Sequence, residues 1–162
     1  MSNSVALSRE ILIQKAAETF ADKGYRATNL SSIAEDLGVT KPALYYYVKS
    51  KKQILWEIFE EILSVYLSSA KRIEEQNLNP KEKMEALIKE HANSVLSHQT
   101  YSKIFFQEQS ELSLQELQIL REKMRLYESY FKKTYEEGVK KGYFKDLDVT
   151  ILIKGMVGML NW

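Results

Sequence analysis

The chain of 162 residues carries 23 Lys and Arg, 22 Asp and Glu and no Cys, and its formal net charge is +1. Without Cys there are no disulfides and no thiolate chemistry, and 44% hydrophobic residues are too many for a chain disordered throughout. The first ten residues lack the basic and apolar regions of a signal peptide, and no apolar run approaches the length of a membrane span. We therefore expect a cytoplasmic protein with no membrane partner.

Nearly every segment has the apolar spacing of an amphipathic helix, and none alternates like a strand, so we predict an all-α fold. Polar residues that can accept hydrogen bonds from unpaired backbone N–H groups mark the expected helix starts. In the N-terminal third these residues are Ser8, Thr28 or Asn29, Thr40 and Ser50. Gly24 and Gly38 are expected to end the first and second helices.

The remainder of the chain is expected to be helical as well. One helix should follow the break at 77–80, and a less regular segment surrounds 101–110. A long helix is expected from about Leu114 to Lys141, where Gly142 ends it, and Asp148 is expected to cap the last helix.

The two short helices joined at residues 37–40 predict a helix-turn-helix motif at about 31–50. Gly38 suits this turn because it tolerates the left-handed backbone that a tight turn requires. We expect one domain over residues 1–52, which contains this motif, and a second, helical domain over residues 53–162.

Charge and aromatic residues are concentrated at the third helix. Residues 1–52 carry a net charge of +3 and the remainder −2, and no acid lies between Leu37 and Trp56. At 100° per residue the third helix turns Leu44, Tyr47 and Val48 to one side. The other side holds Lys41, Pro42, Tyr45 and Tyr46. Exposed aromatics beside lysines fit the major groove of a DNA duplex. The alternative is a protein-interaction module whose Tyr/Lys face binds an acidic partner.

Residues 11–55, ILIQKAAETFADKGYRATNLSSIAEDLGVTKPALYYYVKSKKQIL, resemble the N-terminal domain of the TetR/AcrR (tetracycline-repressor-like) family. The resemblance is carried by Phe20, Gly24, Tyr25, Thr28, Ile33, Ala34, Gly38, Val39, Leu44, Tyr45, Val48, Lys49 and Lys51. It implies a dimeric, ligand-responsive transcription regulator, usually a repressor that leaves a palindromic operator when a small molecule binds. Residues 1–52 would then be the helix-turn-helix DNA-binding domain, and residues 53–162 the helical ligand-binding and dimerisation domain. By position it implies DNA contacts from Thr28, Asn29, Ser31, Thr40, Lys41, Pro42, Ala43, Tyr45, Tyr46 and Lys51. Lys51 would hold a phosphate.

The chain end, residues 146–162, is similar to the penultimate helix of many family members, which helps to build the dimer. This segment is apolar nearly all round, so we expect it to be buried against a second copy. The expected interface residues are Leu152, Gly155, Met156 and Met159. The sequence stops at Trp162 within the apolar stripe, so either it is truncated or the dimer forms differently. A dimer weaker than is normal for the family is expected.

Aromatic residues of the middle helices are candidates for lining a site for a small hydrophobic ligand, and packing in the core is the alternative for each. They are Tyr66, His91, Phe105, Phe106, Tyr127, Tyr130 and Phe131. No metal-ligand spacing, Gly-rich phosphate loop or Ser–His pair with an orienting group is present. We therefore expect no enzyme activity, no metal and no cofactor.

Overall fold

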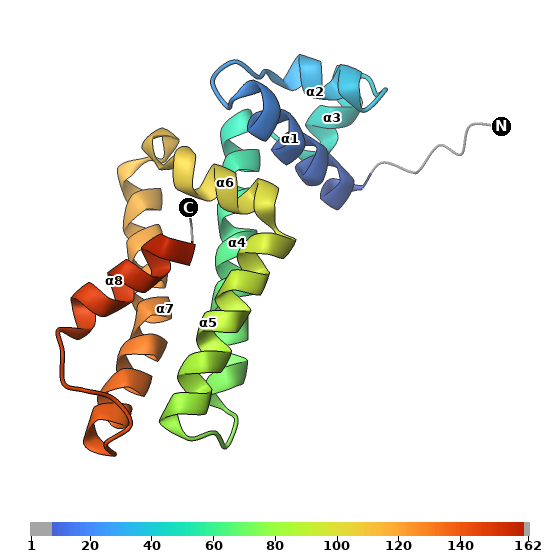
Figure 1. Cartoon of the computed structure of the whole chain (residues 1–162). Coiled ribbons are helices and arrows are strands. Elements are labelled where there is room, and N and C mark those ends of the chain that lie inside the picture. The colour runs from blue at the N-terminus through green and yellow to red at the C-terminus, as the bar shows by residue number, and fades with distance from the viewer. Residues whose placement is uncertain (1–7, 161–162) are drawn as a thin grey trace. The chain divides into compact units, whose positions relative to one another are not determined.

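The computed structural model describes residues 8–160, so predictions about the chain start and about Trp162 lie outside the described residues. Within that range the elements are α1 (Arg9–Lys23), α2 (Leu30–Asp36), α3 (Lys41–Tyr47), α4 (Lys51–Glu74), α5 (Pro80–Ser97), α6 (Gln99–Gln107), a 3-10 turn (Gln109–Glu111), α7 (Leu114–Lys140) and α8 (Val149–Leu160). The described residues form no strand, so the predicted all-α fold is confirmed (Figure 1).

Polar side chains cap the N-terminal ends of α1, α2 and α3, as predicted. The side chains of Ser8, Asn29 and Thr40 each accept a hydrogen bond from the backbone N–H three residues later, at 3.3, 3.0 and 3.4 Å. Asn29 is therefore the cap of α2. Thr28, the other candidate, instead donates its hydroxyl hydrogen to the Gly24 carbonyl at 2.9 Å.

The described chain forms two compact units. The first unit comprises the described residues up to Glu61 together with Thr100–Leu112, and the second comprises Ile62–Gln99 and the described residues from Ser113 onward. α4 and α6 contribute residues to both units. The domain boundary expected between residues 52 and 53 stays a prediction.

The first unit places the turn between α2 and α3 over an apolar interior. Leu12, Phe20, Ile33, Leu44, Leu55 and Phe59 are each at most 2% exposed. Gly38 has φ +66°, as predicted for the turn, and the Val39 N–H donates to the Ala34 carbonyl at 2.9 Å. α2 contacts both α1 and α3 (Figure 1). The turn therefore fixes the orientation of α3 relative to α2.

In the second unit α5 and α7 run antiparallel, and α8 contacts both (Figure 1). Glu74, the last residue of α4, accepts hydrogen bonds from Lys83 of α5, at 3.1 Å, and from Lys133 of α7. Burial alone would raise the pKa of Glu74, but the hydrogen bonds from both lysines outweigh it and lower the pKa below its usual value. The ionised Glu74 side chain therefore links α4, α5 and α7.

One buried polar atom in α7 is not paired. Thr134 is 1% exposed, and its Oγ1 has no hydrogen-bond partner among the described residues. Buried hydroxyls normally find a partner, because leaving one unpaired costs about 1–3 kcal/mol. The unpaired Thr134 hydroxyl therefore lowers the stability of this part of α7.

Gly138 of α7 lies against the ring of Phe144, and we expect Gly138→Ala to destabilise the fold. A Cβ atom at this position would lie 2.2 Å from Phe144 Cδ2. The Phe144 ring is itself stacked on Tyr135, with ring centroids 5.4 Å apart and planes 4° apart. Overpacking should outweigh the gain in helix propensity and lower the free energy of unfolding by about 1–3 kcal/mol. Urea unfolding followed by circular dichroism measures it.

A double-mutant cycle controls this prediction. Phe144→Ala removes the ring that the new methyl group would meet. Adding Gly138→Ala to Phe144→Ala should therefore cost little or nothing. An equal loss of stability in both backgrounds would contradict the steric explanation.

Candidate nucleic-acid interface

α3 has an inner and an outer side, as its sequence predicts. Leu44 is fully buried and Val48, which follows the helix, is 1% exposed. Tyr45 and Tyr46 are 53% and 84% exposed, and Tyr47 is half-buried with its ring edge-to-face against Tyr46, at 5.1 Å between centroids. Two phenol rings therefore project from a helix whose other side is held in the core.

The predicted DNA-contacting residues fall into three groups by exposure. Exposed residues are Asn29, Thr40, Lys41, Pro42, Tyr45 and Tyr46. Ser31, Ala43 and Lys51 are half-buried. Thr28 is 2% exposed, so its side chain is packed inside the first unit. We use the term recognition face for Thr40, Lys41, Pro42, Ala43, Tyr45 and Tyr46.

Lys51, which was predicted to hold a phosphate, makes hydrogen bonds within the chain in this structure. Its ammonium group donates to the carbonyl oxygens of Tyr25 and Thr28, each at 2.8 Å. The same ammonium lies 4.1 Å from the centroid of the Tyr25 ring. The structure thus brings the Lys51 ammonium to the segment between α1 and α2, beside Thr28.

Arg9, at the start of α1, contacts the end of α3 and was missed by the sequence analysis. Its Nη1 donates to the Tyr47 carbonyl oxygen at 2.6 Å, and its Nε donates to the Glu57 carboxylate at 2.9 Å. These partners lie 38 and 48 residues away in the chain. No local pattern around Arg9 could have indicated them.

The predicted ligand-lining residues separate into two groups. Tyr66, His91, Tyr127 and Phe131 form a buried cluster in the second unit, with neighbouring ring centroids 5.2–5.7 Å apart. The Tyr127 hydroxyl is hydrogen-bonded to His91 Nδ1 at 2.9 Å. Burial raises the pKa of Tyr127 far above its usual value, so the hydroxyl stays protonated.

The other predicted ligand residues lie outside this cluster. Phe105 belongs to the first unit, where it is 1% exposed and packs on Phe59 at 5.1 Å between centroids. Phe106 is 37% exposed, and Tyr130 of α7 is half-buried. The seven residues therefore do not form one group.

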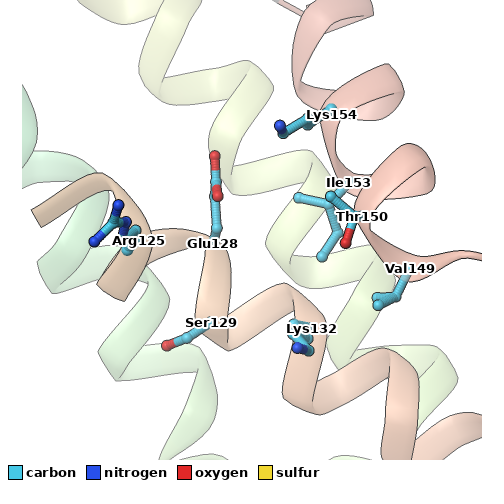
Figure 2. A pocket seen from close by; sticks show the side chains of 8 residues that line it. All are labelled: Arg125, Glu128, Ser129, Lys132, Val149, Thr150, Ile153 and Lys154. Atoms are coloured by element: carbon cyan, nitrogen blue, oxygen red, sulfur yellow. The ribbon is translucent and has the colours of Figure 1, made fainter. Parts of the chain in front are cut away.

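α8 lines hollows of the second unit, and two of them contain several of its residues. The first, of about 230 Å³, lies between α7 and α8 (Figure 2) and is lined by Arg125, Glu128, Ser129, Lys132, Val149, Thr150, Ile153 and Lys154. The second, of about 350 Å³, is lined by Met84, Tyr135, Phe144, Ile151, Leu152, Ile153, Gly155, Met156 and Met159. All four predicted dimer-interface residues line the second hollow, which is apolar.

Other kinds of site find no support in the described part of the chain. Across residues 8–160 no three His, Cys, Asp or Glu side chains are grouped closely enough to hold a metal ion. Among those same residues, no helix combines the length and the apolar character needed to cross a membrane.

The short helix pair, its positive-φ turn and the exposed Tyr/Lys side of α3 define a helix-turn-helix DNA-binding protein. The family model of bacterial regulatory proteins of the tetR family matches residues 12–58, and that of the tetracyclin repressor-like C-terminal domain matches residues 77–162. The chain belongs to the tetracycline repressor family. It is a transcriptional regulator whose partners are operator DNA, a small-molecule ligand and a second copy of the chain.

Similar proteins agree with this assignment. The HTH-type transcriptional repressor KstR2 of Mycolicibacterium smegmatis is 28% identical over 151 residues, which cover 92% of this chain and 74% of that protein. The fatty acid metabolism regulator protein of Bacillus subtilis is 24% identical over 151 residues, 93% of this chain and 78% of that protein. A crystal structure of a TetR/AcrR-family regulator from Thermobifida fusca is 34% identical with a TM-score of 0.73, covering 95% of this chain and 82% of that one.

Proposed function

We propose that this regulator is a cytoplasmic repressor without enzyme activity, which binds a palindromic operator through the recognition face and leaves it when a small hydrophobic ligand binds. The observation that carries the proposal is the exposure of Tyr45 and Tyr46 beside Lys41, on a helix held by a buried Leu44. Repression as the sign of regulation is supported by the similarity to KstR2, which is named a transcriptional repressor.

The recognition face combines the two kinds of contact that operator binding needs. Lys41 and the tyrosine hydroxyls can reach phosphates, which sets affinity and register. Pro42 and Ala43 are small, so the first turn of α3 can approach base edges in the major groove. Asn29 and Ser31, at the start of α2, would contact the DNA backbone beside the groove.

We expect Lys41→Met to weaken binding to every duplex by a similar factor, because a phosphate contact carries no sequence information. The slope of log affinity against log salt should fall by about one unit. Tyr45→Ala should instead change which operators are preferred, by about 1–3 kcal/mol for each base that the side chain reads. Selection of bound genomic duplexes followed by salt titrations measures both effects.

The wild-type protein provides the control for that experiment. Strong and sequence-dependent duplex binding excludes the alternative of a module that binds an acidic protein. If the wild-type protein bound a heparin-like polyanion as well as any duplex, the recognition face would not be a DNA-reading surface.

For the ligand site we propose the buried cluster of Tyr66, His91, Tyr127 and Phe131. It offers aromatic rings with one hydrogen-bonded polar pair, which is the usual composition of a site for an apolar ligand with a polar end. The rings are in contact in the structure, so a ligand must separate them. Such a ligand would bind the rearranged state more tightly, which is what any ligand switch requires.

Fatty acyl compounds are the first ligand class to test, because one relative is named a fatty acid metabolism regulator. We expect oleoyl-CoA or free oleate to weaken binding to the selected operator by at least roughly tenfold, which requires a coupling free energy of about 1.4 kcal/mol. Free CoA is the matched control and should have no effect. Operator binding that stays constant with all three compounds would contradict this ligand class.

A further inference from the structure

At each end of the helix-turn-helix motif, a cationic side chain donates hydrogen bonds to backbone carbonyl oxygens. The Lys51 ammonium binds the carbonyls of Tyr25 and Thr28, which lie in the segment between α1 and α2. The Arg9 guanidinium binds the carbonyl of Tyr47, the last residue of α3. The two cations therefore bracket the segment that forms α2, the turn and α3.

At the start of the motif, Lys51 is held on three sides. Two of its N–H groups are committed to carbonyl oxygens at 2.8 Å, and the Tyr25 ring covers the ammonium at 4.1 Å. Tyr25 is itself fixed, since it is 6% exposed and its ring packs edge-to-face on Phe20 at 5.0 Å. Hydrogen bonds from a charged donor are stronger than neutral ones, so Lys51 fixes the segment before α2.

At the end of the motif, Arg9 belongs to a chain of polar contacts around the turn between α3 and α4. Its partner Glu57 also accepts a hydrogen bond from Gln53 Nε2 at 3.0 Å. Gln53 Oε1 in turn accepts from the Lys49 backbone N–H at 2.8 Å. The hydrogen bond with Glu57 raises the pKa of Arg9, so the guanidinium stays charged. The end of α3 is thus tied to both α1 and α4.

We infer that Arg9 and Lys51 are positioning residues, which hold the two ends of the motif and set the pose of α3 without neutralising a phosphate. This inference rests on the proposed recognition face. Two of the three N–H donors of Lys51 and three of the five of Arg9 are already engaged within the chain. Moving either cation toward a phosphate would weaken these charge-assisted hydrogen bonds. Lys41, in contrast, is exposed on α3.

The test compares Arg9→Met and Lys51→Met with Lys41→Met, using a selected operator and a scrambled duplex. A tilted recognition helix no longer reaches the base edges correctly, so both positioning variants should bind the operator at least about tenfold more weakly. Their binding to the scrambled duplex should stay within about twofold of wild type, and their salt slope should be unchanged. Lys41→Met should weaken both duplexes alike and lower the salt slope by about one unit.

Two further variants keep the outcome interpretable. Arg72→Met removes another Arg–Glu pair, with Glu90 at 2.7 Å in the second unit, and should change neither affinity nor salt slope. Lys51→Arg keeps a charged multiple donor and should restore most of the operator affinity if Lys51→Met folds poorly. Melting curves confirm that each variant is folded at the assay temperature.

The results that would overturn the inference are distinct from those that would overturn the proposed function. A Lys51→Met or Arg9→Met variant whose salt slope falls as in Lys41→Met would show a phosphate contact and exclude a positioning role for that residue. A wild-type protein that prefers no duplex would overturn the recognition face itself, and the inference with it.

Discussion

Met156→Glu is expected to convert the regulator to a monomer and to abolish tight operator binding. Met156 lines the apolar hollow of about 350 Å³ on α8. The same helix leaves Ile151 70%, Leu152 37% and Met159 76% exposed in a single chain. An apolar surface of this kind is the one that a two-fold related copy would bury. A carboxylate buried there without a partner costs several kcal/mol, more than a weak interface can offset.

The decrease in DNA affinity follows from the dissociation of the dimer. A monomer contacts one half-site, so operator affinity should fall by at least roughly 100-fold, whereas the helix-turn-helix fold should be unchanged. Equilibrium sedimentation measures the assembly and a binding assay measures the affinity. Thr150→Glu is the matched control, because it places the same charge on α8 in the other hollow, between α7 and α8. A wild-type chain that stays monomeric at tens of micromolar, roughly the range for a weak interface, would refute this interface.

Phe131→Ala should cost far more stability than Tyr130→Ala, although the two aromatic residues are neighbours on α7. Phe131 is fully buried and packs against Tyr127 at 5.3 Å between ring centroids. Removing a buried ring leaves a cavity and should lower the free energy of unfolding by about 3–5 kcal/mol. Tyr130 is half-buried, so its removal should cost about 1 kcal/mol.

Urea unfolding of both variants decides this prediction, with Tyr130→Ala as the matched control from the same turn of the helix. Equal costs would mean that Phe131 is not part of a packed interior in solution, and that the buried cluster is already open. That outcome would favour a preformed ligand cavity over one that the ligand has to create.

Local signals in the sequence predicted the helices well. Ser8, Asn29 and Thr40 cap helices because each cap depends on a side chain and an N–H only three residues apart. Gly38 marks the turn because few residues other than glycine adopt its positive φ. The outer side of α3 followed from helix periodicity alone, since it requires no knowledge of the rest of the fold.

Contacts between distant residues could not be predicted in the same way. Lys51 looks like any basic residue beside a recognition helix, and its carbonyl partners lie 23 and 26 residues earlier in the chain. Periodicity likewise identified Phe131 and Tyr130 as aromatic candidates but could not show that only Phe131 is fully enclosed. Resemblance to a family gives positions in a motif, whereas the role of each side chain depends on which atoms surround it.

The unpaired hydroxyl of Thr134 bears on how long such a molecule survives. An unsatisfied buried hydroxyl costs about 1–3 kcal/mol, which corresponds to an unfolded population roughly 5- to 150-fold larger than with that atom satisfied or absent. Degradation in cells commonly proceeds through that population, so an unpaired Thr134 hydroxyl would be expected to lower the steady-state abundance of the protein. The abundance of a repressor sets how many operators are occupied, so a substitution at Thr134 would be expected to change the level of gene expression without altering any residue of the recognition face.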